Sequence, residues 1–244
     1  MFTLKSCPVC NSYRITVHRV IAGGDLKCEM MPGVKVDAAI ITRYSSCQNC
    51  DLIFQNPRLS DTELDQFYSS GYYRRTVNQP PEGMDISEAN RAKIDAKIIE
   101  KHIGKVKSHL DSGCGMGYLL NEVNAELEVG IESDVNYVKF KDIKAYREMS
   151  QLAQKSFDLV TSIHSLEHIP YPLDYLKSMV KFVNKNGHLV VEVPSLQTCG
   201  GPYGFAHLHF FKTDVLEKMC IQAGLCVQHT EYTPHLLLIC KISA

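Results

Sequence analysis

The chain has 244 residues, enough for one large or two small domains, and its 45% apolar and 22% charged content is ordinary for a globular protein. Its formal net charge of −1 argues against a protein whose affinity rests on neutralising many phosphates, so a nucleic-acid partner is not expected. No apolar run approaches the roughly 20 residues that cross a membrane, and residues 1–10 lack the apolar core of a signal peptide, so we expect a cytoplasmic protein without a membrane partner.

Two pairs of cysteines near the start of the chain have the spacing of zinc knuckles. The first pair is Cys7 and Cys10, and the second is Cys47 and Cys50. Together they can place four thiolates around one ion, which completes a tetrahedral zinc site and leaves no position open for a catalytic water. We therefore predict a structural Zn²⁺ held by these four side chains. The alternative interpretation is a redox pair or a set of buried free thiols.

The segment between the two cysteine pairs is longer than the usual spacing of roughly 15–20 residues in zinc modules. Residues 13–21 and 34–44 are rich in β-branched side chains, so strands can fill it. We predict a β-rich zinc-ribbon module over residues 1–58. A module of this size has a small apolar core, so metal binding should supply part of its folding free energy.

Residues 59–104 are predicted to form a helical linker. Ser60 followed by Glu63 fits a capping box at the start of one helix, and a second helix is expected at 87–102. The tyrosines between the two helices, Tyr72 among them, either pack between two domains or belong to a lid over a bound cofactor. Both interpretations stay open on the sequence alone.

A glycine-rich stretch with the pattern D-x-G-x-G-x-G at residues 111–117 is the most informative part of the chain. It follows an expected strand at 106–110 and precedes an expected helix at 118–123. Glycine has no Cβ, so a turn of this kind lets a ligand approach the backbone closely. The dinucleotide fingerprint would need glycine where Tyr118 or Leu120 stands, and the Gly-Lys-Ser/Thr of a P-loop does not follow.

From residue 105 onward, expected strands and helices alternate, which predicts a mostly parallel sheet with helices on both faces. In such sheets the ligand lies beyond the carboxyl ends of the strands. Glu132 stands at such an end, 19 positions after Gly113, where a carboxylate can accept hydrogen bonds from both hydroxyls of a ribose. The expected strands are 128–132, 157–163 and 188–193, the expected helices are 135–143, 172–183 and 212–223, and the last two strands, 225–230 and 235–242, should form an antiparallel hairpin.

Five motifs, in the same order along the chain, resemble those of class I S-adenosylmethionine (SAM) dependent methyltransferases. They are the glycine motif at 111–117, the acidic strand at 129–132, the fDlV-like strand at 156–160, the LEHI-like turn at 165–169 and the evP-like strand at 186–194. The resemblance implies an α/β, Rossmann-like doubly wound fold over residues 105–244, with SAM as the methyl donor. It also implies a cofactor site made of Asp111, Gly113, Cys114, Gly115, Gly117, Glu132, His164 and Tyr72.

The N-terminal half resembles, more narrowly, the zinc-ribbon methyltransferases of surface-polysaccharide and deoxysugar pathways. The likeness rests on the cysteine pairs, on Asn56 and Pro57, and on an H-x-h-F motif that begins at His207. The relatives that methylate carbon carry a further C-terminal domain, which is not expected here. The resemblance therefore implies O-methylation of a small-molecule acceptor, in particular a sugar or sugar derivative. The motifs do not indicate an oligomeric state.

Histidines near the expected strand ends are candidates for removing the acceptor's proton, because imidazole has a pKa near neutrality. His168 is the first candidate, since it follows the strand where the methyl group should point, and Glu167 could orient it or bind the acceptor. The further candidates are His164, His207 and His209. Each of these histidines could instead have a purely structural role.

Two other functions stay open on the sequence. Some rRNA methyltransferases also carry an N-terminal zinc finger, so an rRNA or tRNA methyltransferase is the first alternative, although residues 74–75 and 139–141 are the only obvious basic clusters. The second alternative is a non-catalytic protein on the same scaffold that binds partners in a biosynthetic complex. The complete glycine turn and Glu132 argue against it.

Overall fold

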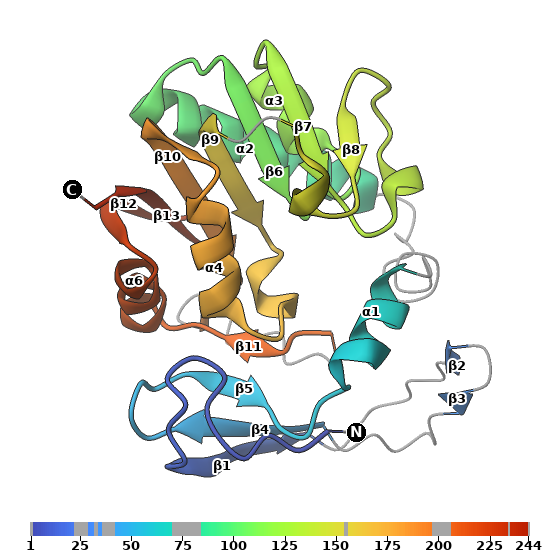
Figure 1. Cartoon of the computed structure of the whole chain (residues 1–244), viewed down its shortest axis with the longest axis vertical. Helices are drawn as coiled ribbons and strands as arrows, with labels where there is room; N and C mark the ends of the chain where they lie inside the picture. The colour runs from blue at the N-terminus through green and yellow to red at the C-terminus, as the bar shows by residue number, and fades with distance from the viewer. Residues whose placement is uncertain are drawn as a thin grey trace.

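The computed structural model describes residues 2–21, 29–31, 34–35, 42–69, 84–153, 156–196, 206–233 and 235–243. Their strands form three sheets, of which the largest has seven strands. Figure 1 shows this sheet with its helices in one part of the molecule and the four-stranded N-terminal sheet in the other, with helix α1 (Asp61–Ser69) between the two parts. The chain therefore folds into a large α/β part and a smaller β part.

The seven-stranded sheet has the order β12-β13-β10-β9-β6-β7-β8. Strands β10, β9, β6, β7 and β8 are parallel to their neighbours in this group, whereas β13 pairs antiparallel with both β10 and β12. The strands are β6 (Ser108–Ser112), β7 (Leu127–Ile131), β8 (Lys144–Tyr146), β9 (Phe157–Ile163), β10 (Val183–Val193), β12 (Leu225–Tyr232) and β13 (Leu236–Ile242). The predicted Rossmann-like α/β fold and the predicted C-terminal hairpin are confirmed.

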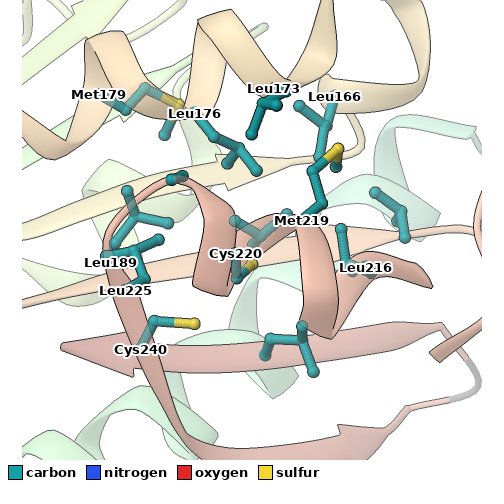
Figure 2. Close-up of a cluster of buried hydrophobic side chains, with 14 of the residues drawn as sticks. Leu166, Leu173, Leu176, Met179, Leu189, Leu216, Met219, Cys220, Leu225 and Cys240 are labelled. Carbon is teal, nitrogen blue, oxygen red and sulfur yellow. The ribbon is translucent and has the colours of Figure 1, made fainter. Parts of the chain in front are cut away.

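Helices cover both faces of this sheet, and the alternation of side chains along β10 shows which face each helix covers. Leu189 and Val191 belong to the buried cluster that includes side chains of α4 and α6, part of which is drawn in Figure 2. Val190, between them, belongs to the cluster that includes side chains of α2 and α3. Successive residues of a strand point to opposite faces, so the two clusters lie on opposite sides of the sheet. The helices are α2 (Met84–Ile103), α3 (Tyr118–Val123), α4 (Pro172–Val180) and α6 (Thr213–Gln222), and the 3-10 turns are η2 (Val135–Tyr137), η3 (Met149–Gln151) and η4 (Leu166–His168).

The N-terminal sheet has the order β1-β4-β5-β11, and all its neighbouring strands are antiparallel. Its last strand comes from far along the chain, since His209 of β11 pairs with Phe54 of β5. The side chains of Tyr44, Ile53 and Phe210 form a buried cluster that holds this strand in place. The strands are β1 (Ile15–Ile21), β4 (Thr42–Cys47), β5 (Ile53–Gln55) and β11 (His209–Phe210), and a separate pair joins β2 (Glu29–Met31) to β3 (Val34–Lys35). The predicted N-terminal β module is present, but β11 was not part of the prediction.

Both predicted linker helices are present. Helix α1 begins with the predicted capping box, in which the Ser60 N–H donates to Glu63 Oε2 at 2.7 Å and the Glu63 N–H donates to Ser60 Oγ at 3.3 Å. Helix α2 extends beyond both ends of the expected range 87–102. Tyr72 and the rest of the segment between the helices lie outside the described residues. Among the described helices, none combines the length and the apolar character that a membrane crossing requires.

The predicted helix at 135–143 is wrong. The segment contains only the single turn η2 and then continues as a loop into β8. Val138 and Phe140 pack against the cluster of Cys114 beside the glycine turn, so their apolar side chains cover that turn instead of forming one face of a helix. Strand β8 was missed because three residues, Lys-Ala-Tyr, are too few to show an alternating pattern.

The predicted helix at 172–183 ends earlier than expected, because Val183 already pairs with Phe157 as the first residue of β10. Strand β10 begins before the expected strand at 188–193, and Gly187 lies inside it, where the pairing of β10 with β9 shifts register. A Cβ at Gly187 would lie 2.9 Å from the carbonyl oxygens of Phe157 and Asp158, so only glycine fits there without a shift of the neighbouring backbone.

Candidate functional site

A cavity of about 950 Å³ lies at the carboxyl ends of the central parallel strands. Ser112 at the end of β6, Glu132 just after β7 and His164 just after β9 all line it. Tyr68 of α1 and Arg91 of α2 are also part of the lining. The cavity is therefore where a ligand is expected in this class of sheet, and its volume suits a small organic molecule.

The glycine turn has left-handed backbone angles at Gly113 (φ +81°), Gly115 (φ +54°) and Gly117 (φ +87°). A Cβ at Gly113 would run into the Ser165 side chain, so the turn packs closely against the loop after β9. The N–H groups of Gly113 and Cys114 both donate to the carbonyl of the last residue of β7, at 2.8 and 3.0 Å. Gly113, Cys114 and Gly115 line the cavity, whereas Gly117 shapes the turn from outside the lining.

Glu132 connects the glycine turn to the tip of β7, and its side chain is buried. Its Oε2 accepts a hydrogen bond from the Gly115 N–H at 3.0 Å, and its Oε1 accepts from the Ser133 hydroxyl at 3.0 Å and the Asp134 N–H at 3.2 Å. The same side chain lines the cavity beside the backbone of the turn. The turn and this carboxylate therefore form one continuous polar surface.

Asp111 is buried at the end of β6 and also lines the cavity. Its Oδ1 accepts a hydrogen bond from the Thr161 hydroxyl at 2.6 Å, and the same hydroxyl lies 2.8 Å from Nε2 of the buried His109. Burial raises the pKa of Asp111 to about 7, against the opposing effect of the Thr161 hydrogen bond. A cationic group bound nearby would stabilise the ionised form of this side chain.

His164 follows β9 with a φ of +50° and lies between two buried carboxylates. Its Nε2 is 3.0 Å from Glu192 Oε1, and its Nδ1 is 3.5 Å from Glu167 Oε1. Burial favours the neutral ring, but the two carboxylates outweigh it and raise the pKa of His164 to about 9. Asp95 of α2 completes the group, and burial followed by the charge of Glu192 raises the pKa of Asp95 to about 8. At neutral pH this group therefore holds a cationic imidazole and a largely protonated Asp95.

Glu167, His168 and His207 come together in another part of the cavity lining. The first two belong to η4, and the third precedes β11. His168 Nε2 is 3.8 Å from Glu167 Oε1, and the centroids of the two histidine rings are 5.0 Å apart. The other ring nitrogen of His168, Nδ1, lies 2.8 Å from Ala206 O and 3.1 Å from Tyr68 Oη. The structure therefore brings together three of the five residues predicted to act on the acceptor.

The carboxylate of Glu167 is unusual for a buried group. Its side chain is 1% exposed, and neither oxygen accepts a hydrogen bond from the described residues. Burial opposes its ionisation, but the pairing with His164 and the charges of the neighbouring histidines lower the pKa of Glu167 to about 2. Its backbone is fixed as well, since the Leu208 N–H donates to Glu167 O at 2.8 Å. A charged, rigidly placed carboxylate thus borders the cavity.

His209, a further candidate for acting on the acceptor, is not part of the cavity lining. It is buried in β11, where its Nε2 lies 2.8 Å from Ile169 O in a hydrogen bond. Burial lowers the pKa of His209 to about 4, so the ring is neutral and suits a structural hydrogen bond. Tyr72, expected near the cofactor, lies outside the described residues.

Sequence reasoning missed several cavity residues that helices contribute. Tyr68, Arg91 and Asp95 line the cavity, as does Arg147 in the loop after β8. Asp95 carried a detectable signal, because it precedes Ile99 by four positions and so interrupts the apolar face of α2 with a carboxylate. The others carried none, since single polar residues on an exposed helix or loop have no distinctive pattern.

The four knuckle cysteines converge in the N-terminal part, away from the cavity. The Sγ atoms of Cys7 and Cys50 are 3.5 Å apart, as are those of Cys10 and Cys47, and all four lie within 4.8 Å of one another. Zn–S bonds of about 2.3 Å in a tetrahedron place thiolates about 3.8 Å apart, so this spacing fits a zinc ion. None of the cysteines in the described ranges forms a disulfide.

A second cluster of possible metal ligands outside the cavity lies where the end of α2 meets β12. His229 Nε2 is 2.9 Å from Glu231 Oε2, and His102 Nε2 is 3.9 Å from the same oxygen. The two imidazole rings stack with centroids 3.8 Å apart. The hydrogen bond and the stacking account for this arrangement without an ion.

A family comparison matches more than half of the chain. Residues 85–230 fit the model of a family described as a methyltransferase domain. The matched span contains the glycine turn, Glu132 and the cluster of Glu167, His168 and His207, whereas the four knuckle cysteines lie before it.

A curated protein and several solved structures are similar to this chain. The ubiquinone biosynthesis O-methyltransferase of Photobacterium profundum is 28% identical over 102 residues, which cover 34% of this chain and 42% of that protein. The chain thus spans less than half the length of this curated relative. The 1,6-didemethyltoxoflavin-N1-methyltransferase of Burkholderia thailandensis, solved with bound S-adenosylhomocysteine, is 14% identical with a TM-score of 0.57, covering 81% of this chain and 98% of that one. Magnesium protoporphyrin IX methyltransferase from Synechocystis PCC 6803, also with S-adenosylhomocysteine, is 14% identical with a TM-score of 0.54, covering 74% and 97%. At these identities the structural likeness shows the fold alone.

Proposed function

The chain belongs to the methyltransferase-domain family and is a SAM-dependent methyltransferase, and we propose that it methylates a hydroxyl oxygen of a small acceptor, in particular a sugar or sugar derivative. The observation that carries the proposal is one cavity with two unlike sides. The glycine turn and Glu132 line it at the ends of β6 and β7, which we call the cofactor side, and Glu167, His168 and His207 line it after β9 and before β11, which we call the acceptor side. The similarity to an O-methyltransferase supports oxygen as the accepting atom. The sugar assignment rests on the resemblance of the N-terminal half to enzymes of polysaccharide and deoxysugar pathways.

The cofactor side fits an adenosyl group with a ribose and an amino acid end. The turn lets a ligand approach the backbone closely, because Gly113 and Gly115 line the cavity and carry no Cβ. We propose that Glu132 accepts hydrogen bonds from the ribose hydroxyls and that Asp111 lies near the ammonium group, whose charge its ionised form would match. When bound, SAM supplies a methyl group already activated on a sulfonium. The residues proposed to hold it are Asp111, Gly113, Cys114, Gly115, Glu132 and His164, with Gly117 shaping the turn.

The acceptor side supplies a group that can take a proton. An Nδ1–H of His168 donating to Ala206 O leaves Nε2 as the acceptor in the neutral ring, and Nε2 faces Glu167. We propose that the acceptor oxygen bonds to the methyl carbon as the carbon–sulfur bond breaks, while its proton passes to Nε2 of His168. Glu167 stabilises the imidazolium that forms, and His207 contacts the acceptor. His209 is assigned a structural role, because it is buried outside the cavity.

The N-terminal part is proposed as a zinc ribbon over residues 1–58, followed by a helical linker at 59–104 and the SAM-binding part at 105–244. The convergence of Cys7, Cys10, Cys47 and Cys50 supports a structural Zn²⁺, since four thiolates leave no open position for chemistry. Free thiols throughout the described chain agree with a reducing, cytoplasmic location, which we include in the proposal.

The proposal is tested in two steps with the full chain. Calorimetry with S-adenosylhomocysteine should show binding at one site, and failure to bind would contradict the cofactor assignment. Mass spectrometry should then show transfer of one methyl group from SAM to a sugar or sugar nucleotide, at a hydroxyl oxygen. Transfer only to a phenolic acceptor would contradict the sugar assignment alone, and tight, salt-sensitive binding of RNA with methylation of it would replace the small-molecule acceptor.

A further inference from the structure

We propose that Glu167, His168 and His207 bind a divalent transition-metal cation on the acceptor side of the cavity. This inference deepens the proposed function and rests on it. The ion would lie at the hydroxyl to be methylated, separate from the zinc proposed at the four cysteines. Its ligands would be one carboxylate and two imidazoles, with the remaining positions open to the cavity.

The first support is the convergence of ligand atoms from two separate segments. One ligand atom from each of the three residues lies within 4.8 Å of the others. His168 Nε2 and Glu167 Oε1 are 3.8 Å apart, which is too long for a hydrogen bond and short enough for two ligands of one ion. The Leu208 N–H donates to Glu167 O at 2.8 Å, so the backbone holds the two segments in this relation.

The second support is the unsatisfied carboxylate of Glu167. It is 1% exposed, and neither of its oxygens accepts a hydrogen bond from the described residues. The cationic ring of His164 lies nearer to Glu192, at 3.0 Å, than to Glu167, at 3.5 Å. The positive charge of His164 is therefore shared between two carboxylates. Burying a charged carboxylate that accepts no hydrogen bond is costly, and a bound cation would supply a closer interaction than the two histidines do.

The third support is the orientation of His168. Its Nδ1 lies 2.8 Å from Ala206 O and 3.1 Å from Tyr68 Oη. Histidines that bind metals characteristically donate their other ring N–H to a backbone carbonyl or a similar acceptor, which fixes the tautomer and the ring orientation. Here that arrangement directs Nε2 toward Glu167 and the cavity, as a metal ligand would require.

The ligand set indicates the class of ion and its chemistry. Two imidazoles and one carboxylate suit ions such as Zn²⁺, Mn²⁺, Fe²⁺ or Co²⁺, and three protein ligands leave positions for the acceptor. An acceptor hydroxyl bound there would lose its proton to solvent more readily, because the cation stabilises the alkoxide. The methyl transfer to oxygen of the proposed function is kept and only the proton acceptor changes, since Nε2 of His168 would then be a ligand of the ion and solvent would take the proton. An acceptor with two neighbouring hydroxyls, as sugars have, could occupy two of the open positions.

The proposal is tested by Mn²⁺ binding to the full chain with its cysteine site loaded with zinc. Binding is measured as the loss of the free-ion signal in electron paramagnetic resonance. Mn²⁺ prefers oxygen and nitrogen ligands over thiolates, so the cysteine site should not compete for it. We expect one bound Mn²⁺ per chain and a loss of affinity of more than about 100-fold in Glu167→Gln and His207→Ala, since even outer-shell changes cost about 10–100-fold. His102→Ala is the matched control, because it disrupts the surface cluster and should leave the affinity unchanged.

The outcomes of this experiment distinguish a failure of the metal site from a failure of the proposed function. Calorimetry with S-adenosylhomocysteine checks that every variant is folded. Unchanged Mn²⁺ affinity in Glu167→Gln and His207→Ala, or loss of binding in His102→Ala, would overturn the cavity site. A wild-type chain that binds no Mn²⁺ and methylates its acceptor in EDTA would also overturn it and leave His168 as the base. A chain that binds Mn²⁺ as expected but neither S-adenosylhomocysteine nor a methyl acceptor would instead contradict the proposed function.

Discussion

The two sides of the cavity are built in different ways. The cofactor side comes from neighbouring segments of sequence, since the glycine turn follows β6 and Glu132 follows the next strand, β7. The acceptor side draws on residues far apart in the chain, because Tyr68 comes from α1 and His207 precedes β11. The first side depends on local backbone geometry, whereas the second depends on how distant parts of the fold meet. Substitutions on the two sides should therefore affect different measurements.

The largest effect is expected on the acceptor side, from His168→Ala. Turnover should fall by roughly 10²–10⁴-fold, because the variant loses the group that activates the acceptor oxygen. The affinity for S-adenosylhomocysteine should stay within about threefold of wild type, since His168 is not assigned to the cofactor side. Steady-state kinetics and calorimetry on the same samples give both values. A nearly normal turnover would remove His168 from the reaction.

The next effect is expected on the cofactor side, from Gly113→Ala. The substitution combines a φ of +81° with a Cβ that would meet the Ser165 side chain, so it should distort the turn and weaken S-adenosylhomocysteine at least about 10-fold. Gly104→Ala is the matched control, because Gly104 has a φ of +84° with no heavy atom within 4 Å of its Cβ position. The control should lose only about 1–2 kcal/mol of stability, measured by denaturant unfolding, and no cofactor affinity. Equal losses of affinity in both variants would show that the fit against Ser165 is unimportant.

A smaller effect is expected from Glu132→Ala. Cofactor binding should weaken by about 1–3 kcal/mol, as for the loss of charge-assisted hydrogen bonds to the ribose. The KM for the acceptor should change little when SAM is saturating, because Glu132 is hydrogen-bonded to the glycine turn and is assigned to the cofactor side. Calorimetry checks the first expectation, and an unchanged affinity would remove Glu132 from the cofactor site.

The smallest effect is a pH dependence of cofactor binding. Burial raises the pKa of Asp111 to about 7, so the free side chain is mostly neutral below that pH and mostly ionised above it. Only the ionised form attracts the ammonium group of S-adenosylhomocysteine, so affinity should rise by up to about tenfold from pH 6 to pH 8. Asp111→Asn should remove this rise. A parallel rise in the wild type and the variant would assign it to another group, such as Asp95.

The difference between the two sides also explains how much the sequence could predict. The glycine motif and Glu132 were recognisable because their spacing along the chain is fixed by one turn and one neighbouring strand. The central strands and most helices could be predicted from apolar periodicity. Residues 135–143 were wrongly predicted as a helix, because their apolar side chains are spaced to cover the glycine turn. The contact of Tyr68 with the cavity could not be predicted, since it depends on how α1 packs. Asp95 was detectable as a carboxylate within the apolar face of α2, but the sequence did not show that it faces the cavity.

The two histidines of the H-x-h-F motif also show what the sequence alone could not predict. His207 and His209 are two positions apart, and the sequence made both of them candidates for acting on the acceptor. Residues at this spacing in a strand usually share one face, but His207 precedes β11 and borders the cavity, while His209 is buried within the strand. The two histidines differ in environment because β11 pairs with β5, and no local sequence pattern predicts that pairing.

The position of β11 in the N-terminal sheet also constrains how the protein folds and how it can be engineered. His209 and Phe54 are paired although they lie far apart in the chain, so the N-terminal sheet stays open at one edge until the residues of β11 have been synthesised. Pairings of such long sequence separation slow folding, and an open strand edge invites association with other chains. A recombinant N-terminal fragment should therefore aggregate, and a chimera that exchanges this module would have to bring its own version of β11 with it.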